Sequence, residues 1–126
     1  MANRNFQPGA KSLEREVIQL YAKFTVGAAN AITVNRGKGI ASIARTAAGK
    51  VTVTLEDVYT NFLFADFLIT PASSAANVMT PSLVSEDVAG AKTIVLGFQD
   101  VETPAFTDLT DGDVVYVELT LKNSTI

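Results

Sequence analysis

The chain has 126 residues, of which 48% are apolar and 18% are charged, and its formal net charge is −3. This length predicts one domain able to bury about two thirds of its surface, and the apolar content excludes a fully disordered chain. The absence of histidine and cysteine excludes disulfides, thiolate chemistry and the usual zinc sites, and it removes the side chain best suited to proton transfer near neutral pH.

The first residues carry positive charge but lead into no apolar stretch, so a secretory signal does not fit. They contain Pro8 and Gly9 and few side chains that could anchor them. We therefore predict a flexible N-terminal arm over residues 1–12 that orders on a partner, and one β-sandwich domain over residues 13–126. No window has the roughly 18 apolar residues of a membrane helix, so we expect synthesis in a cytosol-like compartment and no membrane partner.

The segment 13–26 fits two patterns. Alternate residues from Ile18 to Val26 are apolar, as in a strand, whereas Leu13, Val17 and Leu20 recur at helical spacing. A strand over residues 17–26 is favoured because the later segments have strand patterns.

Four strands are expected in the middle of the chain. Residues 39–46 and 50–56 form a predicted hairpin through a short link that contains glycine. Residues 59–70 are apolar on both faces, which fits a strand buried in a sandwich interior or at a subunit contact. Residues 78–88 contain Pro81 and are at most an edge strand.

Two strands near the C-terminus have the clearest alternation. In residues 92–99 the inward set is predicted to be Ile94, Leu96 and Phe98. In residues 113–122 alternate apolar side chains are predicted to face inward, namely Val115, Val117, Leu119 and Leu121.

These seven or so strands, together with 35 Val, Ile and Thr residues, predict an all-β fold. The expected architecture is a single-domain antiparallel β-sandwich or jelly-roll-like barrel with a flexible N-terminal arm.

Charge is unevenly distributed along the chain. Residues 1–50 contain eight Lys/Arg and two Glu, a net of +6, whereas residues 51–126 contain two Lys and eleven Asp/Glu, a net of −9. Such asymmetry indicates either nucleic-acid binding or an electrostatically matched subunit contact. The basic residues are spread singly without interleaved aromatic residues, so no nucleic-acid partner is expected.

Catalytic patterns are not found. The loop around Gly37 and Gly39 matches neither dinucleotide nor phosphate loops, and no serine lies in a G-x-S-x-G sequence, although a lysine base for one of the serines stays open. The sequence has two pairs of adjacent acids, Glu56-Asp57 and Glu86-Asp87. Within each pair the two side chains would point to opposite faces of a strand, so they cannot act as general acid and general base on one substrate. We expect no enzyme activity, no cofactor and no catalytic residue.

A cluster of aspartates precedes the last strand. Asp108, Asp111 and Asp113 are spaced somewhat like a calcium loop but without its twelve-residue pattern, so a solvated turn is favoured and no metal is expected.

Partner binding is assigned to two groups of side chains. Phe62, Phe64 and Phe67 form the only aromatic cluster, which fits core packing, a subunit seam or, less well, a ligand pocket. The predicted arm supplies the second group, Arg4, Phe6 and Lys11.

Two stretches of the chain carry a family resemblance: GKGIASIARTAAGKVTVTLEDVY at residues 37–59 and DGDVVYVELTLKNS at residues 111–124. Together they resemble small virion structural proteins of tailed bacteriophages, in particular the cement or decoration proteins that cover the capsid exterior. The resemblance implies a homotrimer that binds the major capsid protein on the outside of the virion and stabilises the shell. It implies no active-site residues.

Three alternatives stay open at this point. One is a tail- or fibre-associated virion component with the same sandwich. Another is a carbohydrate or small-ligand binding module, which is disfavoured because the sequence has no Trp and its three tyrosines, Tyr21, Tyr59 and Tyr116, are far apart in the chain. An enzyme is the weakest.

Overall fold

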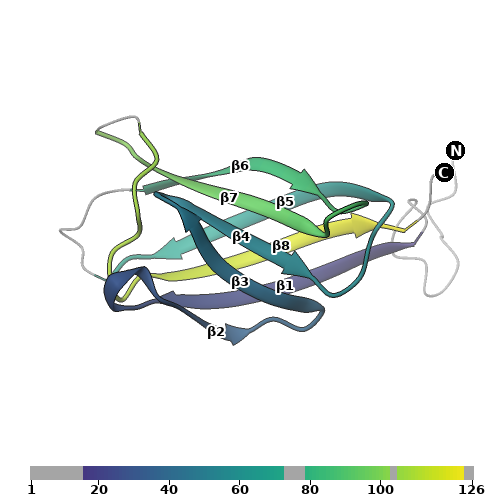
Figure 1. Ribbon diagram of the computed structural model, residues 1–126, viewed down its shortest axis with the longest axis horizontal. Coiled ribbons are helices and arrows are strands. Elements are labelled where there is room, and N and C mark those ends of the chain that lie inside the picture. The colour runs from purple at the N-terminus through teal and green to yellow at the C-terminus, as the bar shows by residue number, and fades with distance from the viewer. Residues whose placement is uncertain (1–15, 73–78, 103–104, 124–126) are drawn as a thin grey trace, which may run out of the picture.

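The computed structural model describes residues 16–72, 79–102 and 105–123. Eight strands form two antiparallel four-stranded sheets that pack face to face (Figure 1). In chain order the elements are β1 (Val17–Val26), the short 3-10 helix η1 (Ala28–Asn30), β2 (Ile32–Arg36), β3 (Ile40–Ala47), β4 (Lys50–Leu55), β5 (Asn61–Thr70), β6 (Met79–Asp87), β7 (Thr93–Asp100) and β8 (Val114–Lys122).

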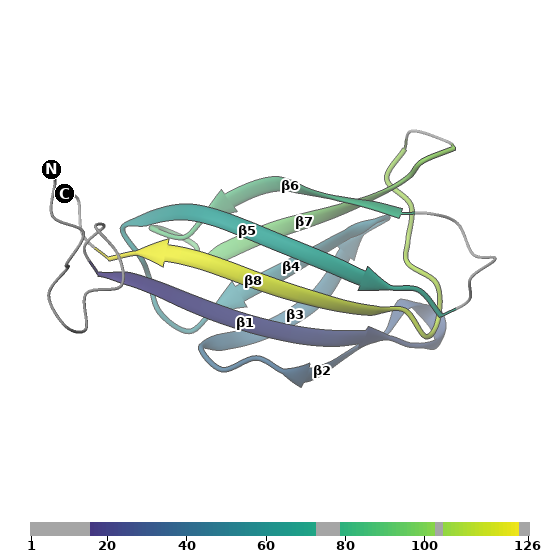
Figure 2. The same cartoon turned by 180° about the vertical axis from the view of Figure 1, so that it is seen from behind.

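One sheet has the strand order β2-β1-β8-β5, and the other has the order β3-β4-β7-β6. Figure 2 shows the first sheet from outside, with β1 and β8 in its centre. The first and last strands of the domain therefore pair along nearly their whole length, from Val17 opposite Lys122 to Thr25 opposite Val114. The predicted all-β sandwich is confirmed.

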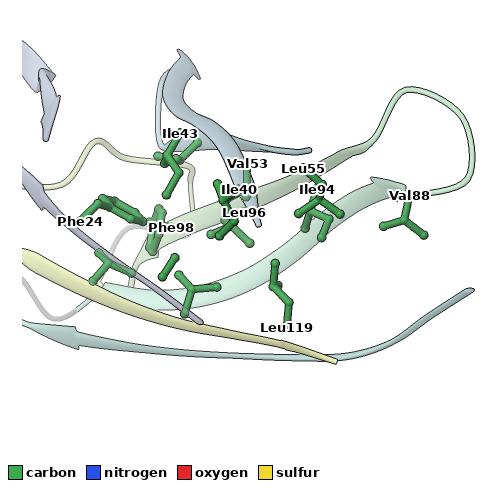
Figure 3. Packing of buried hydrophobic residues seen from close by; sticks show 14 of the residues in the cluster. Phe24, Ile40, Ile43, Val53, Leu55, Val88, Ile94, Leu96, Phe98 and Leu119 are labelled. Atoms are coloured by element: carbon green, nitrogen blue, oxygen red, sulfur yellow. The ribbon is translucent and has the colours of Figure 1, made fainter. Parts of the chain in front are cut away.

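The core lies between the sheets and is built from the inward side chains that alternation predicted. Ile94, Leu96 and Phe98 of β7 and Leu119 of β8 are all fully buried. Figure 3 shows these side chains meeting Phe24 of β1 and the apolar face of β3 and β4. Burial of this apolar area is the main free-energy gain that holds the two sheets together.

Most strand predictions agree with the structure. The ambiguous segment 13–26 contains a strand over the favoured residues 17–26, and β6 is an edge strand as expected for a segment with Pro81. Strand β2 was not predicted, because its five residues are half-exposed or exposed and offer little apolar alternation.

The prediction for residues 59–70 needs correction, because β5 does not lie in the sandwich interior. It is the outermost strand of its sheet. A register shift between Phe62 and Phe64 in its pairing with β8 turns Phe62 toward the core, while Leu63 and Phe64 are exposed. A bulge of this kind explains why the strand looks apolar on both faces in sequence.

Candidate functional site

The two outer surfaces of the sandwich differ in chemistry. On the β3-β4-β7-β6 sheet the outward side chains include many small ones, most of them hydroxylated, together with Lys50 and Val95: the small ones are Ser42, Ala44, Thr52, Thr54, Ser85 and Thr93. Where the chain returns across this sheet, Phe106 packs over Gly97, and a Cβ at that glycine would lie 2.5 Å from the Phe106 ring. Val84 also reaches this glycine, and Lys50 Nζ lies 4.9 Å from the centroid of the Phe106 ring, so the large side chains of this surface gather over Gly97.

The outer surface of the β2-β1-β8-β5 sheet carries aromatic, aliphatic and charged side chains. We call it the tyrosine face, and it consists of Gln19, Tyr21, Lys23, Arg36, Phe64, Asp66, Leu68, Tyr116, Glu118 and Thr120. Cross-strand neighbours in a sheet have Cβ atoms about 4.5–5.5 Å apart, so the pairing register fixes which of these side chains meet.

Two cross-strand rows make up the centre of the tyrosine face. In the first row, Tyr116 of β8 is opposite Lys23 of β1 on one side and opposite Leu68 of β5 on the other. In the second row, Glu118 is opposite Tyr21 and Asp66. The two tyrosines, on neighbouring strands, are therefore diagonal neighbours on one surface.

The charge asymmetry of the sequence appears across this face. Lys23 and Arg36 come from the basic first half of the chain and lie on β1 and β2, whereas Asp66 and Glu118 come from the acidic second half and lie on β5 and β8. Because β1 and β8 are neighbours, opposite charges approach each other within one chain.

A groove of about 350 Å³ runs over the tyrosine face and is lined mainly by Tyr21, Lys23, Leu68 and Tyr116. The Lys23 Nζ atom lies 5.3 Å from the centroid of the Tyr116 ring. The Tyr21 hydroxyl donates to Gln19 Oε1 at 3.2 Å, and Gln19 Nε2 donates to Glu118 Oε1 at 3.4 Å. These contacts position both aromatic rings on the sheet surface.

A second exposed region lies where β5 and β6 form one side of the sandwich. We call it the β5–β6 edge and define it by its three exposed large apolar residues, Leu63, Phe64 and Leu83. A hollow of about 370 Å³ lies beside it, lined by residues of both strands. Each of these strands is the last in its sheet.

The predicted phenylalanine cluster is divided by the bulge in β5. Phe62 and Phe67 are partly buried and pack against the core, whereas the Phe64 side chain is 58% exposed. Phe62 and Phe67 thus take part in core packing, and Phe64 does not. Arg4, Phe6 and Lys11 lie outside the described residues.

Two of the three aspartates before β8 have structural partners, whereas Asp111 lies in an exposed turn. Asp113 is 3% exposed, and its carboxylate accepts hydrogen bonds from the backbone amides of Ala72 at 2.8 Å and Thr110 at 2.9 Å. Asp108 forms a bidentate pair with Arg45. Asp111 is exposed, and no group of three acidic side chains in the described parts of the chain is placed to hold a metal ion.

The second adjacent acid pair also has a local role. Glu86 accepts from the Val88 amide at 3.2 Å, and Asp87 accepts from the amides of Gly90 and Ala91 at 3.1 and 3.0 Å. These bonds satisfy the backbone of the turn between β6 and β7, as acidic side chains commonly do in turns.

Comparison of the chain with protein-family models, curated protein sequences and solved structures finds no match. Across the described residues, no helix is long and apolar enough to cross a membrane.

Proposed function

We propose that this protein is a structural component of a virion, a cement or decoration protein that binds the outside of a bacteriophage head as a homotrimer and stabilises the shell of the major capsid protein. The observation that carries the proposal is the exposed apolar β5–β6 edge on an otherwise well-packed sandwich. The resemblance of residues 37–59 and 111–124 to cement proteins supports the same function.

Strand β5 is the last strand of its sheet and leaves one edge unpaired. A ten-residue edge strand with exposed apolar side chains is an aggregation hazard in a monomer, and natural proteins cover or blunt such edges. A closed ring of identical copies covers the edge in every copy and stops growth at a defined size. We therefore assign the β5–β6 edge to contact with a second copy of this chain, with Phe64 as its most exposed side chain.

Cement proteins act through contact area rather than reaction chemistry. A two-layered sheet scaffold is stiff, and a symmetric oligomer multiplies weak contacts to the shell into strong attachment. A tail- or fibre-associated virion component would use the same contact between copies, so the position on the particle separates these two functions.

The first test is the mass of the purified protein by light scattering after size exclusion. We expect three times the 13.3 kDa of one chain, and we expect Phe64→Lys to give a folded monomer because it places a charge in the contact. Val34→Lys is the control, since Val34 is 43% exposed on β2 at the opposite edge of the same sheet. A monomeric wild-type protein, or equal masses for Phe64→Lys and wild type, contradicts the proposed contact.

The second test concerns the particle. Heads that lack the protein should release DNA at a lower temperature than complete heads, and added wild-type protein should restore the higher temperature. Phe64→Lys should restore it less than Val34→Lys does. Equal heat resistance with and without the protein contradicts a cement function, and binding to tails instead of heads supports the tail-associated alternative.

A further inference from the structure

Tyr21 and Tyr116 are far apart in the chain but adjacent on the tyrosine face, which removes one of the two reasons that disfavoured a carbohydrate site in the sequence; the other, the lack of Trp, leaves stacking to tyrosine. Tyr21 is 58% exposed and Tyr116 is 41% exposed. Tyr116 pairs with Lys23, two residues along β1 from Tyr21, so the rings lie in adjacent cross-strand rows. Two exposed aromatic rings on one flat sheet form a stacking surface that single exposed tyrosines do not provide.

Polar groups of both signs border this surface. Asp66 and Glu118 line the groove in the cross-strand row of Tyr21, and Lys23 and Arg36 line it in the row of Tyr116. Carboxylates only accept hydrogen bonds at neutral pH, whereas the ammonium and guanidinium groups only donate. The groove volume of about 350 Å³ lies in the range of small-ligand sites, which combine apolar and aromatic walls with a few polar groups.

We propose that the groove of the tyrosine face binds a neutral oligosaccharide. A pyranose ring presents a face of C–H groups that packs on an aromatic ring, and its rim of hydroxyls both donates and accepts hydrogen bonds. The carboxylates of Asp66 and Glu118 accept from those hydroxyls, and Lys23 and Arg36 donate to their oxygens. Because acidic and basic groups are balanced in the groove, a neutral ligand fits it better than a strongly charged one.

The two tyrosines offer different ring areas for stacking. The Lys23 Nζ atom covers one side of the Tyr116 ring at 5.3 Å, and Tyr116 is less exposed than Tyr21. Tyr21 is therefore the main stacking surface and Tyr116 the second. Both rings come from strands of a packed sheet, so binding requires little ordering of the protein.

The test uses the protein's own fluorescence. The sequence has no Trp and three Tyr, and Tyr59 is 7% exposed in the core, so Tyr59→Phe leaves only the two groove fluorophores. This variant is titrated with cello-, malto-, xylo-, manno- and chitohexaose. We expect at least one of these probes to change the emission saturably.

Variants at the groove then locate the binding. Tyr21→Ala should weaken binding about tenfold or more, Tyr116→Ala should weaken it less, and Tyr21→Phe should retain most of it, each measured by calorimetry with the same hexaose. Val101→Ala is the control, because Val101 is 59% exposed, similar to Tyr21, and lies outside both the groove and the β5–β6 edge.

Several outcomes overturn the proposal. One is the absence of a saturable response to every hexaose. Another is unchanged binding in Tyr21→Ala, and a third is equal loss in Val101→Ala. If no hexaose binds and Tyr21→Ala instead abolishes binding to capsids, the tyrosine face is a protein contact rather than a saccharide site. The mass of the oligomer tests the β5–β6 edge separately, so failure of one proposal is distinguishable from failure of the other.

Discussion

The guanidinium of Arg45 and the carboxylate of Asp108 form two parallel hydrogen bonds, from Nε to Oδ1 at 2.7 Å and from the terminal nitrogen Nη2 to Oδ2 at 2.9 Å. They join β3 to the segment that leads from one sheet into β8 of the other. Asp108 Oδ1 also accepts from the Gly49 amide at 2.8 Å, so one carboxylate holds both the β3–β4 turn and the connection between the sheets. Bidentate geometry makes this pair more specific than an ordinary surface contact.

The Arg45–Asp108 contact predicts acid sensitivity. The hydrogen bond from Arg45, aided by the Gly49 amide, holds the pKa of Asp108 below its ordinary value of 3.8. A carboxyl group whose pKa is lower in the folded state stabilises the fold above its unfolded pKa, and this stabilisation disappears as the pH falls through the folded pKa. Asp108→Asn should therefore be less stable than wild type at neutral pH and equally stable in strong acid.

Urea unfolding of both proteins at a series of pH values measures this difference. Arg45→Met is the companion variant. At neutral pH it should lower the urea concentration at the midpoint of unfolding less than Asp108→Ala does, because in Arg45→Met the Asp108 carboxylate still accepts from the Gly49 amide. A pH-independent difference between wild type and Asp108→Asn would rule out the linkage.

A second prediction concerns Gly49 in the β3–β4 turn. Its φ is +67°, and a Cβ there would lie 2.7 Å from the Phe106 carbonyl carbon and 2.9 Å from the Phe98 oxygen. These neighbours are backbone atoms and cannot move like side chains. Gly49→Ala should lose more than about 3 kcal/mol of the free energy of unfolding, from the positive φ and the crowding together.

Gly27→Ala provides the control for that substitution. The φ of Gly27 is −107°, and a Cβ there meets its nearest neighbour, the Ala31 oxygen, at 3.6 Å. Its stability should differ from wild type by no more than about 1 kcal/mol in the same denaturant experiment. Similar losses for both variants would contradict the assigned close packing over Gly49.

A third prediction compares two leucines on neighbouring strands. Leu119 of β8 is 0% exposed, whereas Leu68 of β5 is 66% exposed on the outer surface. Leu119→Ala should lose about 2–5 kcal/mol by leaving a cavity in the core, while Leu68→Ala should stay within about 0.5 kcal/mol of wild type. Urea denaturation measures both, and a large loss in Leu68→Ala would mean that this leucine is covered by another copy.

The sequence by itself determined the strands whose side chains alternate and the faces that they bury. The inward residues of β7 and β8 and the hairpin of β3 and β4 were predicted, because a strand places successive side chains on opposite sides wherever it lies. Short polar β2 carried too little apolar signal to be found.

Only the tertiary structure decided which strands are neighbours. The edge position of β5 exposes Phe64, the pairing of β1 with β8 brings Tyr21 beside Tyr116, and the crossing between sheets joins Arg45 to Asp108. Strand order depends on how all apolar faces of the chain are buried together, and no local pattern records that choice. For this reason the candidate surfaces of the protein emerged from residues that are distant in sequence.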